Sequence, residues 1–283
     1  MDPRMLEIVS NRPELVTALP RWMFPESVER ELQTTEGLAI GEIAGRDSIA
    51  AVLEAVKEMR LKALLPTIAY TGTEFGDWVP LFKKIELLAQ ELAGRSVKVF
   101  DPVLLGAPRW WRHLCGRYVP SLFNRFGFYS PCAGCHLYLH ALRIPLARRI
   151  NCKIIIGGER ESHEGKVKIN QTAAALDACT AFAGSFGIDL FLPLRKISRD
   201  EDIASIIGRQ RWEADEQLGC VLSGNYRDET GKVTCREDDI KRFFNEYALG
   251  EAECLVREVL PTPQGSSRSL SGVERQDSSL RSE

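Results

Sequence analysis

The sequence has few of the features that mark membrane, secreted or strongly nucleic-acid-binding proteins. No apolar run approaches the ~20 residues of a membrane-spanning helix. The N-terminal MDPRMLEIVSNRPE lacks the basic-then-apolar order of a secretion signal. The 37 basic and 39 acidic side chains leave a net charge of −2, so any contact with nucleic acid must be local. We therefore expect a cytoplasmic protein with no membrane partner.

Cysteine is also sparse. Eight cysteines among 283 residues are too few to form the disulfide scaffold of a chain this long. In a reducing compartment the close pair Cys132 and Cys135 indicates metal or redox chemistry. Cys152 and Cys179 stand alone in apolar runs, which is typical of small buried side chains.

What the sequence does contain is a regular alternation of apolar runs. Continuous apolar segments at 37–44, 64–70, 97–103, 153–158 and 189–194 read as strands, and amphipathic segments at 48–60, 78–93, 135–150, 169–187 and 199–209 read as helices. Apolar strands separated by helices form a parallel sheet with both faces covered. The pattern predicts an α/β protein with a doubly wound parallel sheet of the Rossmann-like type.

The same patterns divide the chain into three regions. Residues 1–35 precede the first strand and read as an N-terminal extension. Residues 36–260 hold the α/β domain. Residues 261–283 have the serine-rich and charged composition of a disordered tail. In such domains ligands bind at the carboxyl ends of the strands, which directs attention to the loops after 44, 70, 101 and 158.

The first of these loops has the composition of an anion site. GEIAGRDSIAAVLEAV (41–56) ends a strand in a glycine turn and begins a helix, whose first N–H groups and dipole favour a phosphate. Ala44 and Gly45 let an anion approach the backbone closely, and Asp47 or Ser48 can cap the helix. The same residues also suit a plain turn with an N-cap. Neither a Walker loop nor G-x-G-x-x-G is present.

The segment Ile43 to Ser48 resembles the S-G-G-x-D-S loop of the PP-loop ATP pyrophosphatases, the adenine nucleotide alpha hydrolase superfamily. The second glycine, the Asp and the Ser match. Two later segments resemble the phosphoadenylylsulfate reductase branch: IAYTGTEFGDW (68–78) is similar to D-T-G-x-E-x-P, and GGERES (157–162) to G-x-R-x-x-[QE]-S. Between them lies a Cys-initiated helix with a matching Pro-Leu pair, Pro145 and Leu146.

The resemblance implies how ATP and Mg²⁺ would be held. The phosphates would lie on residues 44–48, with Arg46, Asp47, Ser48 and Arg160 at the reacting centre. The implied nucleotide-binding residues are Ala44, Gly45, Asp47, Ser48, Thr71, Gly72, Glu74 and Gly158. Glu74 or Asp77 would help to hold Mg²⁺ or the ribose. The substrate oxygen would attack the α-phosphorus and release pyrophosphate.

One departure from that branch argues against its reaction. Sulfonucleotide reductases end in a Glu-Cys-Gly-x-His segment that carries a nucleophilic thiol. Here the nearest candidate is Glu253-Cys254-Leu255-Val256, which has neither the Gly nor the His. We therefore expect an ATP pyrophosphatase-type transferase or ligase and disfavour the reductase.

The cysteine pair predicts a second kind of chemistry. SPCAGCHLYLHALR (130–143) places Cys132 and Cys135 around a glycine turn at a helix start, where both sulfurs can face one ion. Zn²⁺ would need further ligands, and Cys115, His113, His136 and His140 are near enough in sequence to supply them. An iron–sulfur cluster with one open iron would need a third thiolate.

C-x-x-C followed by a distant cysteine is similar to the PP-loop tRNA thiolation enzymes, whose three cysteines hold a [4Fe-4S] cluster. This resemblance implies Cys220 as the third ligand. The alternatives that remain open for that position are Cys115, Cys152, Cys179, Cys235 and Cys254. The aromatic and basic interval 109–129 suits either base stacking or a packed cover, and we favour the cover.

These observations predict an adenylating enzyme that transfers sulfur to a small-molecule or RNA substrate, with an external sulfur donor. The alternatives are a zinc-containing ligase of the deazaguanine synthase type and a non-catalytic nucleotide or redox sensor. The sequence leaves a homodimer open.

Overall fold

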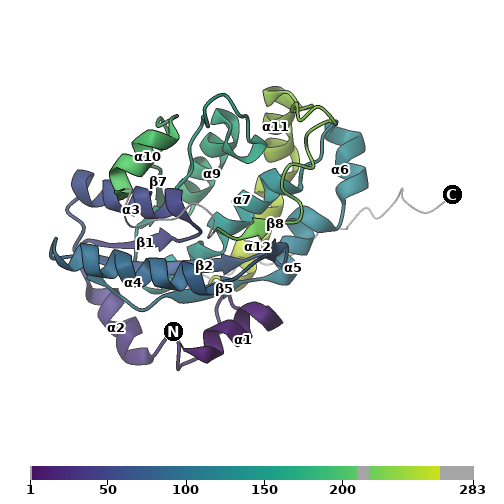
Figure 1. The fold of residues 1–283 in the computed structure, drawn as a ribbon. Helices are drawn as coiled ribbons and strands as arrows, with labels where there is room; N and C mark the ends of the chain where they lie inside the picture. Colours follow the sequence, from purple (N-terminus) through teal and green to yellow (C-terminus); the bar gives the residue numbers. More distant parts are fainter. Residues whose placement is uncertain (1, 209–216, 262–283) are drawn as a thin grey trace.

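The chain folds around one parallel sheet, seen in a computed structural model that describes residues 2–208 and 217–261 (Figure 1). The strands lie in the order β4-β2-β1-β6-β7, and β5 also pairs with β2. Their bounds are β1 (Leu38–Glu42), β2 (Ala63–Tyr70), β4 (Lys98–Val99), β5 (Val103–Gly106), β6 (Ile154–Ile156) and β7 (Asp189–Phe191). The predicted doubly wound parallel sheet is confirmed.

The order of the strands indicates where a ligand would bind. The chain runs outward from β1 to β2 and then to β4 and β5, and it returns to the other side of β1 for β6 and β7. Ligands bind where the order reverses, outside the carboxyl ends of the strands. The loops after β1 and β6 therefore meet at this point.

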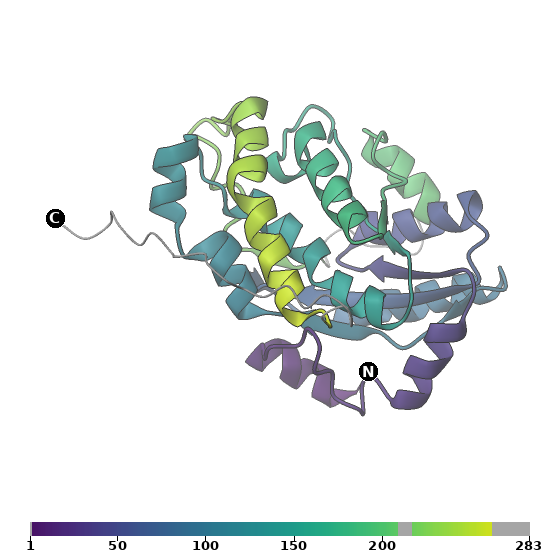
Figure 2. The same ribbon diagram turned by 180° about the vertical axis from the view of Figure 1, so that it is seen from behind.

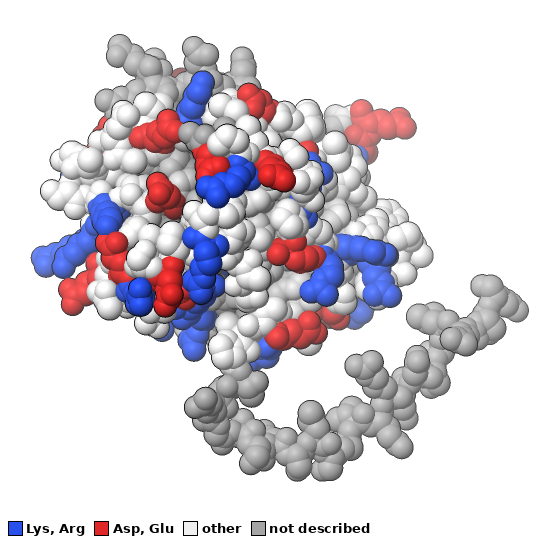
Figure 3. Space-filling view, turned by 90° about the horizontal axis from the view of Figure 1, so that it is seen from below, with Lys and Arg blue, Asp and Glu red and all other residues white. Residues whose placement is uncertain are grey.

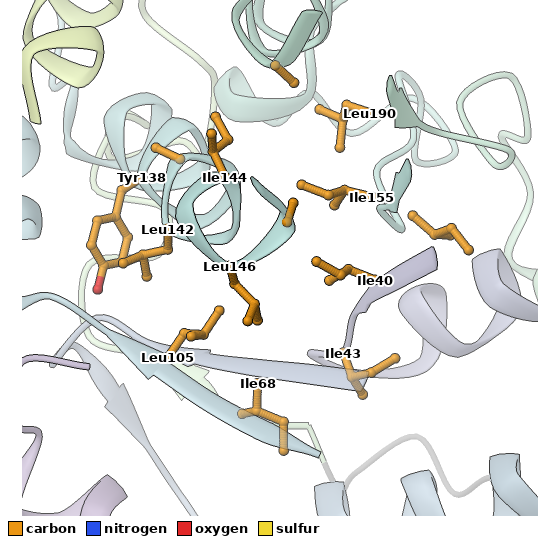
Figure 4. Close-up of a cluster of buried hydrophobic side chains, with 14 of the residues drawn as sticks. Ile40, Ile43, Ile68, Leu105, Tyr138, Leu142, Ile144, Leu146, Ile155 and Leu190 are labelled. Atoms are coloured by element: carbon orange, nitrogen blue, oxygen red, sulfur yellow. The ribbon is translucent and has the colours of Figure 1, made fainter. Parts of the chain in front are cut away.

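The sheet is held by residues that are buried on both faces. Ile40 pairs in register with Ile155, and both side chains are fully buried. Each such side chain contributes roughly 1.5–3 kcal/mol through the apolar surface that it removes from water. Figure 4 shows Ile40, Ile155 and Leu190 of the strands in one buried cluster with Ile144 and Leu146.

The strand predicted over 97–103 is interrupted. β4 pairs with the start of β2 and β5 with its end, so both lie on the same side of β2. Asp101 and Pro102 separate them, and Pro102 has no N–H to donate to a neighbouring strand.

Helices cover both faces, as Figures 1 and 2 show from opposite sides. One face carries α3 (Arg46–Glu58) and α4 (Val79–Ala93), with α10 (Asp200–Ile207) packed on α3. The other carries α7 (Pro131–Ala141), α8 (Arg143–Arg149) and α9 (Ala173–Ser185), with α12 (Leu249–Val259) packed against all three. The shorter elements are α5 (Pro108–Trp111), η1 (Arg112–Gly116), α6 (Val119–Phe126), η2 (Ile169–Gln171), α11 (Glu237–Phe243) and η4 (Phe244–Ala248).

The helix predicted over 135–150 is wrong in two respects. It begins at Pro131, so Gly134 lies inside α7 and forms no turn between the two cysteines. A β-carbon on Gly134 would lie 3.1 Å from the Leu114 carbonyl oxygen, which shows how closely η1 packs on this helix. The helix also breaks at Leu142, so Pro145 falls in the first turn of α8, where a missing N–H leaves no bond unmade.

Residues 2–35 pack onto the edge of the sheet. They form α1 (Pro3–Asn11) and α2 (Glu26–Thr34), which lie below the sheet in both ribbon views. Leu15 and Gly106 exchange two backbone hydrogen bonds of 2.6 and 3.1 Å, which closes the exposed edge of β5. The extension thus shares the core of the domain. Apart from Pro261, the predicted tail 261–283 lies outside the described residues.

The face seen from below carries both signs of charge. Figure 3 shows acidic and basic side chains interspersed there, and α2 contributes ion pairs such as Arg21 with Glu29 at 3.1 Å. This face offers no field of one sign to a polyanion. None of the helices in the described ranges combines the length and the apolar character that a membrane crossing requires.

Candidate functional site

The loop between β1 and α3 is closed by the side chain of Ser48. Ser48 Oγ accepts hydrogen bonds from the N–H groups of Ala44 and Gly45, each at 3.0 Å, and donates to the Gly45 carbonyl at 2.7 Å. Gly45 is the N-cap of α3, so Ser48 completes the cap from the third helical position, and Asp47 does not. The N–H groups of the first helical turn have no acceptor within the helix, so they remain available to an anion.

The loop after β6 packs directly on this helix start. A β-carbon on Gly158 would lie 2.6 Å from the Ser48 nitrogen and 2.8 Å from the Asp47 carbonyl carbon. Only a glycine permits this approach. The contact brings Arg160 to α3, where its Nε donates to Asp47 Oδ2 at 2.9 Å.

Asp200 joins the same group from the start of α10. It accepts from Arg160 Nη2 at 2.7 Å and lies 3.0 Å from Arg46 Nη2. The hydrogen bond from Arg160 lowers the pKa of Asp200. Lys168 interacts electrostatically with these residues, and burial lowers its pKa. The sequence analysis singled out neither Asp200 nor Lys168, because no local pattern places either residue at the loop.

The group therefore holds three basic side chains, Arg46, Arg160 and Lys168, around two carboxylates. Arg160 is 2% exposed, so its charge is held in a desolvated place. An incoming polyphosphate would meet these cations together with the helix N-terminus. The predicted residues Gly45, Arg46, Asp47, Ser48, Gly158 and Arg160 thus lie in one place.

The loop after β2 binds its own glutamate. Glu74 Oε1 accepts from the Thr71 N–H at 2.6 Å and the Thr71 hydroxyl at 2.7 Å, and Oε2 accepts from the Gly72 N–H at 2.9 Å. Gly72 has a φ of +96°, which lets the backbone close around the carboxylate. Asp77 accepts from the Val79 N–H at 2.9 Å, just before α4. Both carboxylates predicted to hold Mg²⁺ or ribose thus have partners within the loop.

Three of the eight cysteines come together beside this loop. Cys220 lies in β8 (Gly219–Cys220), which pairs antiparallel with β3 (Glu74–Phe75). Its sulfur is 3.2 Å from the Thr73 hydroxyl. Cys132 and Cys135 reach the same place from the first turn of α7, and Trp111 Nε1 donates to the Cys135 sulfur at 3.4 Å.

The thiols perturb one another. Burial, followed by the charge of Cys220, raises the pKa of Cys132 to about 11. Burial raises the pKa of Cys135, and Glu74 adds to the effect. Fully buried Cys115 lies nearby, and its pKa is raised by burial and by Cys135. These thiols stay protonated at neutral pH unless a cation stabilises their anions.

One short segment connects the loop between β1 and α3 to the thiols. The Gln217 side chain lies against Gly45, where a β-carbon would be 3.0 Å from Gln217 Cδ. Cys220 is three residues further along the chain. Three extended residues span at most about 11 Å, so the α-carbon of Cys220 is no further than this from that of Gln217.

The structure also shows a buried polar group around His136 and His140 of α7, two residues that the sequence interpretation had only offered as zinc ligands beside the cysteines. His136 and His140 approach Glu159, the residue after Gly158, and their ligand atoms all lie within 4.8 Å of one another. His140 Nδ1 is 2.9 Å from Glu42 Oε1. Burial lowers the pKa of His140, but Glu42 and Glu159 raise it more, so the pKa lies above its ordinary value. The i, i+4 spacing of the two histidines was the available signal.

No protein-family profile matches this chain. A protein of Methanocaldococcus jannaschii, uncharacterized protein MJ0009, is 39% identical over 223 residues, which make up 78% of this chain and 80% of that protein. The crystal structure of a 4-thiouridine synthetase–RNA complex with bound ATP matches 80% of this chain with a TM-score of 0.50 and 14% identity. This chain spans 53% of the length of that synthetase.

The U34-tRNA thiolase NcsA from Methanococcus maripaludis was solved with its [4Fe-4S] cluster. The match covers 83% of this chain and 79% of the NcsA chain, with 13% sequence identity. Its TM-score of 0.36 is too low to support an argument. The likeness to the 4-thiouridine synthetase shows a shared Rossmann-like α/β fold, with a parallel central sheet flanked by helices. At 39% identity over most of both chains, this protein belongs to the same family as MJ0009 of Methanocaldococcus jannaschii.

Proposed function

We propose that this protein is an ATP-dependent adenylating enzyme of the PP-loop class that transfers sulfur to its substrate. One observation carries the proposal: the segment 217–220 touches the nucleotide loop through Gln217 and brings Cys220 to Cys132 and Cys135. A site that activates an acceptor and a site that holds sulfur must be this close if one substrate is to pass between them.

The first step is adenylation. ATP would place its phosphates at the first turn of α3, where unpartnered N–H groups meet Arg46, Arg160 and Lys168. A substrate oxygen forms a bond to the α-phosphorus while the bond from that phosphorus to the bridging oxygen breaks, and pyrophosphate leaves with the bonding electrons. The three cations neutralise the charge that develops on the phosphates. Asp47 and Asp200 hold the two arginines in place before ATP arrives.

Mg²⁺ is the cofactor that nucleotidyl transfer requires, and it would neutralise charge on the phosphates. Asp47 and Asp200 are the carboxylates at the loop, and their oxygens are the ligand type that Mg²⁺ prefers. Glu74 lies in the loop after β2, where Thr71 and Gly72 donate to it, so in this proposal it shapes that loop.

The three thiols fit an iron–sulfur cluster better than one zinc ion. A tetrahedral Zn²⁺ at about 2.3 Å from each sulfur needs sulfurs about 3.8 Å apart. Within the described ranges, the cysteines form no group whose ligand atoms lie within 4.8 Å of one another, although they are near enough to shift one another's pKa. Cys132, Cys135 and Cys220 would therefore hold a [4Fe-4S] cluster.

Cys132, Cys135 and Cys220 would supply three ligands to such a cluster, which would hold sulfide from an external donor for the transfer. A sulfur nucleophile then bonds to the activated carbon of the acceptor, and the carbon–oxygen bond to AMP breaks. Trp111 and Thr73 orient the thiols of Cys135 and Cys220.

The acceptor class that the surface favours is RNA. The helices α5, η1 and α6 form a cover, and Trp111 in this cover donates a hydrogen bond to the Cys135 sulfur. The cover exposes four basic side chains: Arg109, Arg112, Arg117 and Arg125. Tyr118 and Phe123 are exposed among them, whereas Trp110, Phe126 and Phe128 pack inside. Exposed rings beside arginines bind unpaired bases and phosphates.

The test is turnover with ATP, Mg²⁺, radiolabelled sulfide and unmodified tRNA under anaerobic conditions. We expect pyrophosphate release that depends on the tRNA, and sulfur label in the RNA. Pyrophosphate release without label would favour the ligase, with nitrogen as the incoming atom. No pyrophosphate release with any acceptor would contradict the proposal and leave a nucleotide or redox sensor.

A further inference from the structure

The group formed by His136, His140 and Glu159 has three buried polar atoms without hydrogen-bond partners. They are His136 Nδ1, His140 Nε2 and Glu159 Oε2. The side chain of His140 is 1% exposed and that of Glu159 is 8% exposed, so water does not readily supply the missing partners. Leaving buried polar atoms unpaired costs free energy, and each such atom therefore calls for a partner.

The spacing of these atoms matches a metal coordination sphere. Glu159 Oε1 is 3.5 Å from His136 Nδ1 and 3.5 Å from His140 Nε2. These separations are too long for good hydrogen bonds. Ligand atoms that each lie about 2.0–2.2 Å from a tetrahedral ion are about 3.4 Å apart, which is close to the separations in this group.

The neighbouring residues prepare His140 to act as a ligand. Its Nδ1 lies 2.9 Å from Glu42 Oε1, and Arg143 Nη1 lies 3.3 Å from the same carboxylate oxygen. If Nδ1 carries the proton and donates it to Glu42, then Nε2 presents its lone pair toward Glu159. A carboxylate behind a histidine in this way fixes the tautomer of metal-binding histidines.

The charges of the group also leave room for a cation. Glu42, Glu159 and Arg143 are each less than 10% exposed, and with both histidines neutral, as metal ligation requires, they sum to one negative charge. Without an ion, a proton on His140, whose pKa the two carboxylates raise, balances that charge, and a bound cation would replace the proton. Gly157 allows the two carboxylates to gather there, because a β-carbon on it would lie 2.4 Å from Glu159 Oε2 and 3.4 Å from Glu42 Oε2. A buried negative charge without a counterion is unfavourable.

We propose that His136 Nδ1, His140 Nε2 and the Glu159 carboxylate bind a divalent transition-metal ion. Two imidazoles and one carboxylate suit Zn²⁺ or Fe²⁺. The site uses none of the cysteines, although His136 lies one helical turn after Cys132 on α7, and it does not rest on the proposed sulfur transfer. Because Glu159 directly follows Gly158, the ion would lie one residue from the contact with the nucleotide loop.

Cobalt(II) is the probe that tests the site. The full chain with Cys132→Ser and Cys220→Ser, stripped with a chelator, is titrated with Co²⁺. We expect one tightly bound ion with d–d absorption bands and without the sulfur-to-cobalt charge-transfer band that a thiolate ligand produces. In that background His136→Asn and Glu159→Gln should each abolish stoichiometric binding, and Glu42→Gln should weaken it by about 10–100-fold.

The matched control is His113→Asn, which removes a histidine that pairs with Glu251 elsewhere in the fold; it should leave binding unchanged. His136 is the most exposed of the three proposed ligands, so its variant should fold even if Glu159→Gln does not. No bound cobalt, a spectrum dominated by sulfur ligation, or binding that survives His136→Asn would each overturn the site and leave a buried ion-pair network.

Discussion

A β-carbon on Gly158 would lie 2.6 Å from the backbone nitrogen of Ser48. This contact joins the ends of β1 and β6 at the point where the strand order reverses. It also sets the position of Arg160, two residues further on, against Asp47. The geometry of the loop between β1 and α3 thus depends on a glycine that is distant in sequence.

Gly158→Ala should therefore displace the start of α3. Because the clash is with backbone atoms, the strain should lower the free energy of unfolding by about 1–3 kcal/mol and weaken ATP binding. Chemical denaturation and ATP titration measure the two effects. Gly184→Ala in α9 is the control, since nothing lies within 4 Å of the added carbon. An alanine at 158 with native stability and native ATP affinity would contradict the contact.

Asp47→Asn tests the charge arrangement at the loop. The amide keeps the shape of the side chain but removes the charge that holds Arg160 and Arg46. Small misplacements of a reacting group cost about 100-fold in rate, and we expect pyrophosphate release to fall by that order with the fold intact. Glu54→Gln, on the same helix and paired with Lys57, should be silent. Native turnover in Asp47→Asn would remove the loop from the mechanism.

Tyr138 ties α7 to the sheet. Its hydroxyl donates to the Tyr70 carbonyl at 2.8 Å and accepts from the Ala107 N–H at 2.9 Å. Tyr138→Phe leaves both backbone groups buried without a partner, so it should lower the free energy of unfolding by about 1–3 kcal/mol. Tyr118→Phe, at an exposed tyrosine, provides the comparison. Equal stabilities for the two variants would show that the bridge does not hold α7.

The raised pKa of Cys132 predicts a pH dependence in the metal-free protein. Burial raises this pKa to about 11 in the folded chain, above the ordinary value of about 8.5. The folded state then binds more protons than the unfolded state above about pH 8.5, so stability falls as the pH rises through this window.

Between about pH 8 and about pH 10, the wild type should lose about 2 kcal/mol more than Cys132→Ser. Denaturant unfolding of chelator-treated protein at the two pH values measures this difference. Cys254→Ser, which changes an exposed thiol, should lose as much as the wild type. If Cys132→Ser and the wild type lose the same stability, the Cys132 thiol is not buried as the structure has it.

The fold could be predicted from the sequence because the apolar runs are continuous and are separated by helical patterns. The pattern could not show that Asp101 and Pro102 break the third strand, since the residues on either side remain apolar. It also missed that Gly134 lies inside a helix. That position depends on the close approach of η1 to α7, which is a tertiary contact with no local signal.

The candidate site could be predicted only where a motif is local. Gly45, Asp47 and Ser48 stand together in the chain, and Cys132 and Cys135 are three residues apart. Asp200 and Lys168 reach the loop only through the folding of distant segments. Glu159 lies inside the segment that resembles the reductase branch, but the two histidines that approach it are on α7. Only the folding of the chain brings the three residues together.

The measurement that tests the central claim most directly is iron and acid-labile sulfide per chain, on protein purified without oxygen. The account predicts about four iron and four sulfide per chain in the native sequence, their loss in Cys220→Ser, and their retention in Cys254→Ser, which alters an exposed thiol. Native protein without iron and sulfide, or a Cys220→Ser variant that keeps both, would contradict it.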